Sequence, residues 1–428
     1  MTTSEMFTQF ADNLKIDNEE QISDRYAEIT RVLNKHYRDS ESKTANSLQV
    51  GSYGRHTAIR GISDLDMIYM LSDDEWARFK DGRQSALLQE VKGVIKERYP
   101  RTDIKGDGQV VVVSFDNQDV EVVPAFEQED GSFKYPDTHD GGSWPITRPR
   151  EEIQAISKMN GDKNSNLRPL CRMVRAWKNK HGVVMGGLLI DTLAHNFLES
   201  TDQYDESSFG DYDVMVRDFF EYLANQKKQE YYFAPESNQK VYVVKAFQRK
   251  AKKAFNFCCE AIDAGQTASA NAKLKRVFGR PFPATKTKLF TASAKTWHDT
   301  EEFIEDKYPV DVRYALEIDC EVKQAGFLEH MLREMLVKHL PLLADKTLMF
   351  KVTECTVPEP YHLEWKVVNR GDEAERLDKI RGEIVRDAGW GEKKETTNFR
   401  GEHEVECYAV KNGVVVARAH IDVPITTR

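Results

Sequence analysis

The sequence predicts an α+β protein of two or three domains, and three observations lead to this prediction. The chain has 428 residues, whereas a single domain usually takes about 100–200 residues. Strand patterns dominate up to residue 145, helical patterns follow up to residue 295, and strand patterns return from residue 300. Strands with few long crossover connections favour α+β. We therefore divide the chain into residues 1–145, 146–295 and 300–428.

The first segment, residues 1–145, combines helices with strands. Apolar residues at helical spacing predict one helix near residues 22–37 and another near residues 87–95. Between them, residues 48–71 are typical of a short strand, a glycine-containing turn and a second strand that ends in a buried apolar run. Residues 110–126 have the pattern of two paired strands joined by turn residues. This segment is therefore expected to form a lobe with a sheet.

The second segment, residues 146–295, is expected to form a helical lobe. In the helix around residues 167–178, Pro169 lies early enough to be tolerated in the first turn. Trp177 falls on the apolar face of this helix, and we expect it in the core. The polar residues 267–288, rich in Pro and Gly toward their end, are typical of a domain end.

The third segment, residues 300–428, returns to strand patterns. One amphipathic helix is predicted at residues 329–340. Two alternating runs near the end of the chain are joined through Asn412-Gly413, and Asn-Gly is the strongest short hairpin signal. The segment is therefore expected to form a smaller α/β domain.

Composition excludes several classes of protein. The net charge is −9, and 40% of the residues are hydrophobic and spread throughout, which argues against disorder. No apolar run approaches the ~20 residues that span a membrane, and the N-terminus lacks the pattern of a signal peptide. The six cysteines include no CxxC pair, so free thiols are expected. We expect a soluble, cytoplasmic protein that does not bind membranes.

Two aspartates form the first candidate site. Asp64 and Asp66 lie two residues apart in a predicted strand, so their carboxylates share one face while Leu65 and Met67 point into the core. Adjacent carboxylates repel each other unless a cation neutralises them, and such oxygen ligands suit Mg²⁺. The alternative interpretation is a surface-exposed acidic turn.

A glycine-containing segment precedes these aspartates. Gly51 and Ser52 supply backbone N–H groups and a hydroxyl that can approach phosphate closely. A turn that holds phosphates beside a divalent-metal pair is what phosphoryl or nucleotidyl transfer requires. The order and spacing of the two halves of this motif predict a catalytic site.

A third carboxylate would complete a two-metal site. Asp119 and Glu121 share a strand face, and Glu121 is flanked by Val120 and Val122. An acidic residue in such apolar surroundings is costly unless a metal or another partner neutralises it. Both residues are candidates at this point.

The motif GSYGR, followed by SDLD and then VEVVPAF, resembles the nucleotidyltransferase superfamily that includes DNA polymerase β. Within it, the sequence is most similar to the bacterial CD-NTases, also called SMODS proteins. The resemblance implies an active site between a sheet-containing lobe and a helical lobe. It also implies that Asp64, Asp66 and Glu121 bind two Mg²⁺ or Mn²⁺ ions. Many family members have aspartate in place of Glu121, which keeps Asp119 as an alternative ligand.

The resemblance extends into the helical lobe. The segment Arg-Met-Val-Arg-Ala-Trp-Lys, residues 172–178, is similar to a basic family helix that contacts nucleotide phosphates. It implies nucleotide binding by Arg175 and Lys178, and we add Gly51, Ser52 and Arg55 of the first motif to this set. Solvated helix charge is the alternative for Arg175 and Lys178. The family's usual Leu-Glu pair is replaced here by Ile190-Asp191.

Residues 300–428 are similar to the adenylyl/guanylyl-and-SMODS C-terminal (AGS-C) sensor domain. Four of its residues are able to stack on or pair with a base, and Trp365 is equally suited to a core. Ligand sensing and a structural or protein-docking role therefore stay open. The four residues are Tyr361, Trp365, Phe399 and Arg400.

These resemblances imply an enzyme that joins NTPs, such as ATP or GTP, into a cyclic oligonucleotide second messenger for anti-phage signalling (CBASS). A downstream effector would read the product, and a regulatory protein partner is compatible with this role. The alternatives are a linear oligonucleotide synthetase, a tRNA-tailing nucleotidyltransferase and a non-catalytic nucleotide-binding regulator. The sequence leaves the bases, the linkage and the ring size of the product open.

Overall fold

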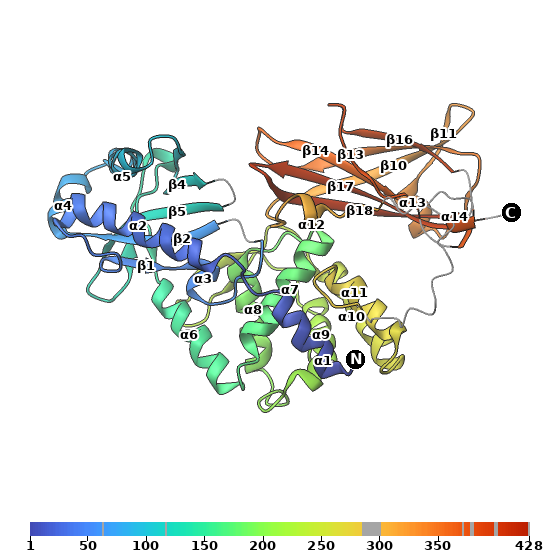
Figure 1. Ribbon diagram of the computed structural model, residues 1–428, viewed down its shortest axis with the longest axis horizontal. Helices are drawn as coiled ribbons and strands as arrows, with labels where there is room; N and C mark the ends of the chain where they lie inside the picture. The colour runs from blue at the N-terminus through green and yellow to red at the C-terminus, as the bar shows by residue number, and fades with distance from the viewer. Residues whose placement is uncertain are drawn as a thin grey trace. The chain divides into compact units, whose positions relative to one another are not determined.

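The computed structural model describes residues 1–61, 64–115, 118–284, 301–369, 372–376, 381–397 and 401–426. The chain divides into two compact units, which Figure 1 shows in ribbon form. The first comprises Met1–Ala176 and Met185–Pro283, and the second comprises Trp177–Val184 and Ala284–Arg428. The predicted lobes 1–145 and 146–295 therefore fall largely within one unit.

A seven-stranded mixed sheet forms the centre of the first lobe, with strand order β1-β2-β5-β4-β3. β2 and β5 run parallel, whereas the β1–β2, β5–β4 and β4–β3 pairs are antiparallel. β6 pairs with β5 and β7 pairs with β6. The strands are β1 (Ser47–Gln49), β2 (Asp64–Leu71), β3 (Asp103–Asp107), β4 (Val110–Phe115), β5 (Gln118–Glu127), β6 (Phe133–Lys134) and β7 (Ile146–Thr147).

Helices cover one face of this sheet. Apolar side chains of α2 (Glu19–Arg38) and α5 (Gln84–Arg98) form one core with alternate residues of β2, β4 and β5. The short helices α3 (Gly51–Gly54) and α4 (Asp73–Phe79) flank β2 in the chain. Because side chains alternate along a strand, the intervening residues of β2 and β5 point to the opposite face.

Helices dominate the rest of the first unit. α1 packs Phe7 and Phe10 against Phe278 and Phe282, so the N-terminus contacts residues near the end of this unit. The short hairpin β8–β9 lies between α9 and α10 in the chain. The elements are α1 (Thr3–Asn13), α6 (Pro149–Asp162), α7 (Leu167–His181), α8 (Gly187–Glu199), α9 (Tyr212–Ala224), β8 (Tyr231–Phe233), β9 (Lys240–Tyr242), α10 (Gln248–Asp263) and α11 (Ala268–Phe278).

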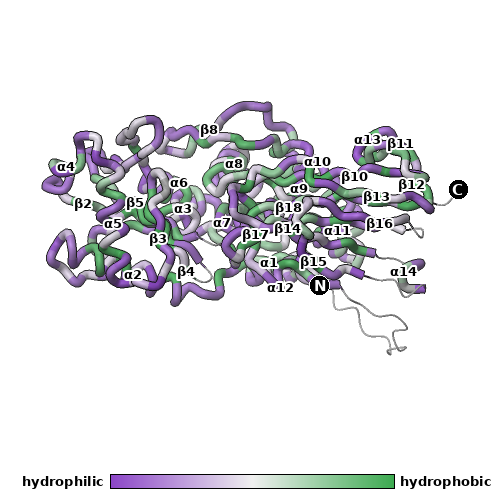
Figure 2. Tube along the Cα trace, turned by 90° about the horizontal axis from the view of Figure 1, so that it is seen from above, coloured by the Kyte–Doolittle hydropathy of each residue, from purple (hydrophilic) through white to green (hydrophobic). Residues whose placement is uncertain are grey.

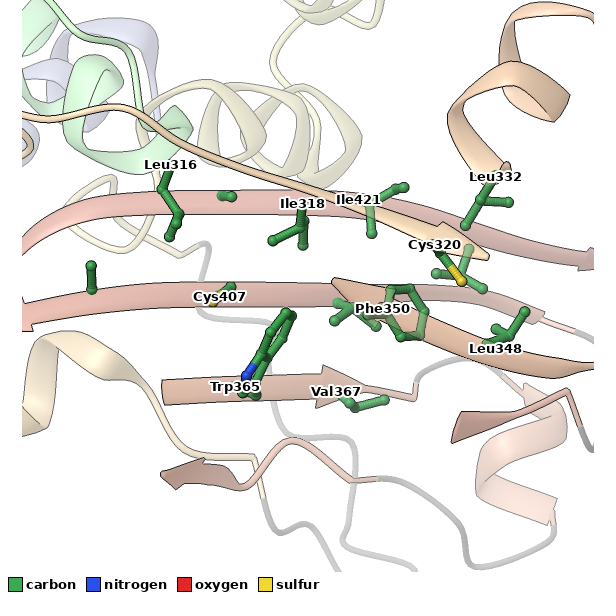
Figure 3. Packing of buried hydrophobic residues seen from close by; sticks show 14 of the residues in the cluster. Leu316, Ile318, Cys320, Leu332, Leu348, Phe350, Trp365, Val367, Cys407 and Ile421 are labelled. Carbon is green, nitrogen blue, oxygen red and sulfur yellow. The ribbon is translucent and has the colours of Figure 1, made fainter. Parts of the chain in front are cut away.

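The second unit contains two sheets, ordered β11-β10-β13-β16 and β12-β18-β17-β14-β15. Apolar residues of both sheets form one core, and Figure 3 shows several of them between the strands. The strands are β10 (Leu316–Gln324), β11 (Phe327–Met331), β12 (Leu342–Leu343), β13 (Thr347–Cys355), β14 (His362–Val368), β15 (Ile384–Arg386), β16 (Glu392–Thr396), β17 (Gly401–Lys411) and β18 (Val414–Thr426). Its helices are α12 (Ile304–Lys307), α13 (Leu332–Val337) and α14 (Asp372–Arg376).

The α+β prediction is confirmed, and so are most of the predicted elements. Asn412 and Gly413 both have positive φ, 51° and 74°, in the turn of the β17–β18 hairpin. The predicted domain end at residues 267–288 contains the division between the two units, at Pro283, and its first half forms α11. The helix predicted at residues 329–340 is shorter, because β11 extends to Met331.

No helix in the described parts of the chain is both long enough and apolar enough to cross a membrane. In Figure 2, which colours the chain by hydropathy, hydrophobic and hydrophilic stretches alternate along the tube.

Candidate active site

Three carboxylates meet at the beginning of β2 and β5. Asp66 is paired in register with Glu121, and Asp64 with Asp119, across the parallel strands. Asp64, Asp66 and Glu121 each offer an oxygen, and these three atoms all lie within 4.8 Å of one another. All three residues are half-buried. The structure therefore brings together the three ligands that the sequence predicts.

The apolar residues of both strands force this arrangement. Leu65 and Met67 of β2, and Val120 and Val122 of β5, are fully buried in the core beneath α2 and α5. Because neighbouring side chains point to opposite faces, burial of these residues places the carboxylates on the other face.

The donor set fits a hard divalent cation. Carboxylate oxygens are the ligands that Mg²⁺ prefers, and three of them at this spacing can surround a cation. In the described residues, Asp119 does not belong to this group, although it was a candidate from the sequence. This geometry therefore favours Glu121 as the third ligand.

The glycine turn lies directly against Asp66. The backbone N–H of Val50 donates to the carbonyl of Asp66 (3.0 Å), and the chain then enters the one-turn helix α3 at Gly51 with φ 62°. A Cβ atom built on Gly51 would lie 1.8 Å from Oδ2 of Asp66. Glycine is required here both for the positive φ and for the space that the carboxylate occupies.

Tyr53 of α3 packs against the apolar core of the first lobe. Burial and then the negative charge of Asp64 raise the pKa of Tyr53 far above its usual range.

Arg55 and Arg175, both predicted to bind nucleotide, are engaged with one buried carboxylate. Arg55 Nε donates to Asp191 Oδ2 (2.8 Å), and Arg175 donates to Oδ1 (2.6 Å) and Oδ2 (3.0 Å) of Asp191. The side chain of Asp191 is fully buried, and those of the two arginines are 6% and 4% exposed. These ion pairs give both arginines a structural role, and their phosphate contacts stay a prediction.

Asp191 is stabilised in its charged form. Burial alone would raise the pKa of its carboxyl, but Arg175 and Arg55 outweigh burial and hold the pKa well below the usual range. Thr57 Oγ1 also donates to Asp191 Oδ2 (2.9 Å). Asp191 therefore connects α7 and α8 to the segment that follows the glycine turn.

Lys178, the third predicted phosphate-binding cation, lies in the second compact unit. Its ammonium forms an ion pair with Asp311 Oδ1 (3.0 Å), and both side chains are largely buried. The neighbouring Asn179 donates to the carbonyl of Val310 (2.7 Å) and accepts from the N–H of Val312 (3.1 Å). The end of α7 from Trp177 is therefore built into this unit, and the phosphate contact of Lys178 stays a prediction. Trp177 is fully buried, as expected.

The candidate base-stacking residues of the second unit have different surroundings in the structure. Trp365 is a core residue, and its indole N–H donates to Asp387 (2.8 Å), so the structural alternative holds for it. Tyr361 is partly buried against the same core. Phe399 and Arg400 lie outside the described residues.

Two domain families match this chain. Residues 1–160 match the Second Messenger Oligonucleotide or Dinucleotide Synthetase domain, abbreviated SMODS. Residues 298–426 match the Adenylyl/Guanylyl and SMODS C-terminal sensor domain. The chain is therefore a nucleotidyltransferase of the CD-NTase (SMODS) family with a C-terminal sensor domain. No match was found among curated proteins.

Several solved structures are similar to this chain. Escherichia coli MS115-1 CdnC in complex with HORMA-deltaN is 15% identical, with a TM-score of 0.51, over 66% of this chain and 98% of the CdnC chain. CdnC with ATP is 17% identical, with a TM-score of 0.49, over 66% and 99%. Bradyrhizobium diazoefficiens CdnG with GTP is 11% identical, with a TM-score of 0.48, over 65% and 95%. The first of these likenesses shows a shared fold.

Proposed function

We propose that this protein condenses NTPs into a cyclic oligonucleotide second messenger and releases pyrophosphate. The observation that carries the proposal is the group formed by Asp64, Asp66 and Glu121 within the SMODS-matching residues. A chain with this family's two domains and an intact carboxylate group has the parts that nucleotidyl transfer needs.

Asp64 and Asp66 would hold two Mg²⁺ or Mn²⁺ ions, and Glu121 would help to hold the one next to the acceptor hydroxyl. When bound, the cations would lower the pKa of that hydroxyl and stabilise negative charge on the transferred phosphorus. Gly51 leaves room for the Asp66 carboxylate, and the α3 turn fixes its position. Gly51 and Ser52 remain the proposed phosphate-contacting residues of this turn, since Arg55 is engaged with Asp191.

ATP and GTP are the proposed substrates. The match of residues 1–160 to a synthetase domain for second-messenger oligonucleotides or dinucleotides supports NTPs as the substrate class, and ATP and GTP are the first to test. The product, released into the cytoplasm, would reach a separate effector in anti-phage defence. A regulatory protein is a further proposed partner, since CdnC was solved with a HORMA protein.

The second compact unit would sense a nucleotide or another signal. This proposal rests on the match of residues 298–426 to the sensor domain family. Because Trp177–Val184 belongs to this unit, we test sensing in the full chain rather than in a fragment of residues 300–428. Any ligand that binds the folded unit must raise its thermal midpoint by linkage.

The proposed activity is tested by incubating the protein with four labelled NTPs and Mg²⁺ or Mn²⁺, followed by phosphatase and mass spectrometry. A cyclic product resists phosphatase because it has no terminal phosphate. A product that phosphatase trims would indicate a linear synthetase, and extension of added tRNA would indicate a tailing enzyme. Absence of any product, together with nucleotide binding, would indicate a non-catalytic regulator.

A further inference from the structure

The segment that follows the glycine turn is held from the helical lobe by several contacts. Arg168 Nε donates to the carbonyl of Arg55 (3.3 Å), and Arg172 donates to the carbonyl of His56 (2.9 Å). The Asp191 carboxylate accepts from the side chains of Arg55 and Thr57 (2.8 and 2.9 Å). Side chains of α7 and α8 thus fix three consecutive residues of this segment, residues 55–57.

These three residues in turn complete α3. The N–H groups of Arg55 and Thr57 donate to the carbonyls of Gly51 (3.2 Å) and Ser52 (2.9 Å). Gly51 fits against the Asp66 carboxylate with no room for a methyl group. A displacement of residues 55–57 would therefore move Gly51 relative to Asp66, which is one of the three proposed metal ligands.

We propose that Asp191 is a positioning residue for the metal site: through Arg55 and Thr57 it sets the place of the α3 turn, and thereby the orientation of the Asp66 carboxylate. This inference rests on the proposed metal-binding role of Asp64, Asp66 and Glu121, and it assigns to Asp191 no contact with substrate or metal.

The charge balance of the buried group explains why a carboxylate is needed. Asp191 faces the guanidinium groups of Arg55 and Arg175, and Glu152 lies 3.7 Å from Arg55. Asp191 makes the closer ion pairs with these guanidinium groups, 2.8 Å to Arg55 and 2.6 Å to Arg175, so its negative charge is the main one that balances them. Without that charge, two buried cations would repel each other, and Arg55 would be free to leave its position.

The hydroxyl of Thr57 allows a test that leaves this charge balance intact. Thr57→Val keeps the shape of the side chain and removes only its hydrogen bond to Asp191. The matched control is Thr192→Val on α8, next to Asp191 in sequence. Thr192 is fully buried, and its hydroxyl has no hydrogen-bond partner in the structure as described, so this change removes no contact to the segment.

The measurement is direct Mn²⁺ binding to the full chain, monitored through the EPR signal of free Mn²⁺. Thermal midpoints are recorded in parallel. We expect Thr57→Val to weaken Mn²⁺ binding about tenfold, at the lower end of the effect of removing a residue that orients a metal ligand. Thr192→Val should bind Mn²⁺ as the wild type does. Asp191→Asn should weaken Mn²⁺ binding more than Thr57→Val does. The Mn²⁺ affinity of Arg55→Lys should lie between those of Thr57→Val and Asp191→Asn.

Wild-type Mn²⁺ affinity in a folded Thr57→Val protein would overturn the proposal, and so would an equal loss in Thr192→Val. If Asp191→Asn fails to fold, the Mn²⁺ affinity of Thr57→Val still decides whether the proposal holds. A wild-type protein that binds Mn²⁺ but makes no nucleotide product would refute the proposed function and leave this inference standing. The two failures are therefore distinguishable.

Discussion

Gly51 and Asp66 are packed so closely that a methyl group on the glycine would lie 1.8 Å from the carboxylate oxygen Oδ2. Gly51 begins α3 shortly after β1, and Asp66 belongs to β2, so the contact joins the two halves of the sequence motif. It makes the glycine a determinant of where a proposed metal ligand points.

Gly51→Ala should therefore abolish most product formation, with a loss of about 100-fold or more, because the new methyl group must displace the Asp66 carboxylate. The matched control is Gly82→Ala, since Gly82 also has a positive φ, 71°, but a Cβ there meets nothing within 4 Å. Both variants should lose stability from the strained φ. Equal activity of the two variants would contradict the collision with Asp66.

Glu121→Gln should be far more damaging than Asp119→Asn. Glu121 belongs to the group of close carboxylates, and Asp119, within the structure as described, does not. Removing one charge from the group weakens its hold on the cation, whereas Asp119 lies outside it. Initial rates at saturating and limiting Mg²⁺ measure the difference, and the reverse order would transfer the ligand role to Asp119.

Lys178→Met should destabilise the second unit, since the buried Asp311 loses its ammonium partner and keeps Arg313, whose Nε donates to Oδ2 (2.8 Å). Leaving a buried charge unpaired typically costs about 3–5 kcal/mol, and the remaining Arg313 should keep the loss at or below the lower end of that range. Lys338→Met is the control, because Lys338 pairs with Glu334 on the surface, where such pairs contribute about 0–1 kcal/mol. Urea unfolding compares the two variants. A loss in Lys178→Met no greater than in the control would argue against the structural role.

The effect of Lys178→Met should depend on pH. Burial would raise the pKa of Asp311, but Lys178 and Arg313 outweigh it and hold the pKa below the usual range. A depressed carboxyl pKa adds stability above the unfolded-state value of about 3.9, and this stability is lost as the pH falls through the folded-state pKa. The stability difference between wild type and variant should therefore be constant from pH 8 to 6 and shrink below about pH 4. A difference that grows in acid would contradict this sign.

The sequence predicted the carboxylate site well because that prediction depends on local alternation. Asp64 and Asp66 share a face by strand geometry alone, and the apolar residues between them fix which face it is. The parallel register that brings Glu121 opposite Asp66 is a tertiary property, and only the family resemblance supplied it.

The buried acidic partners of the predicted phosphate-binding cations could not be predicted from the sequence. A basic helix residue looks the same in sequence whether it faces solvent, phosphate or a buried acid. Arg175 and Lys178 lie on one helix, yet they pair with Asp191 and Asp311, which are 16 and 133 residues away in sequence. No local pattern encodes those distant partners. The two compact units divide α7 between Ala176 and Trp177. This division could not be predicted from the pattern of the segment either.

Product formation by the double variant Asp64→Asn/Asp66→Asn tests the central claim most directly. The control is Asp73→Asn/Asp74→Asn, which removes the same charge from an exposed pair at the start of α4. We predict that wild type and control make a phosphatase-resistant nucleotide with Mg²⁺, and that the Asp64/Asp66 variant folds but makes none. The same product from a folded Asp64→Asn/Asp66→Asn protein would contradict the assignment of this site.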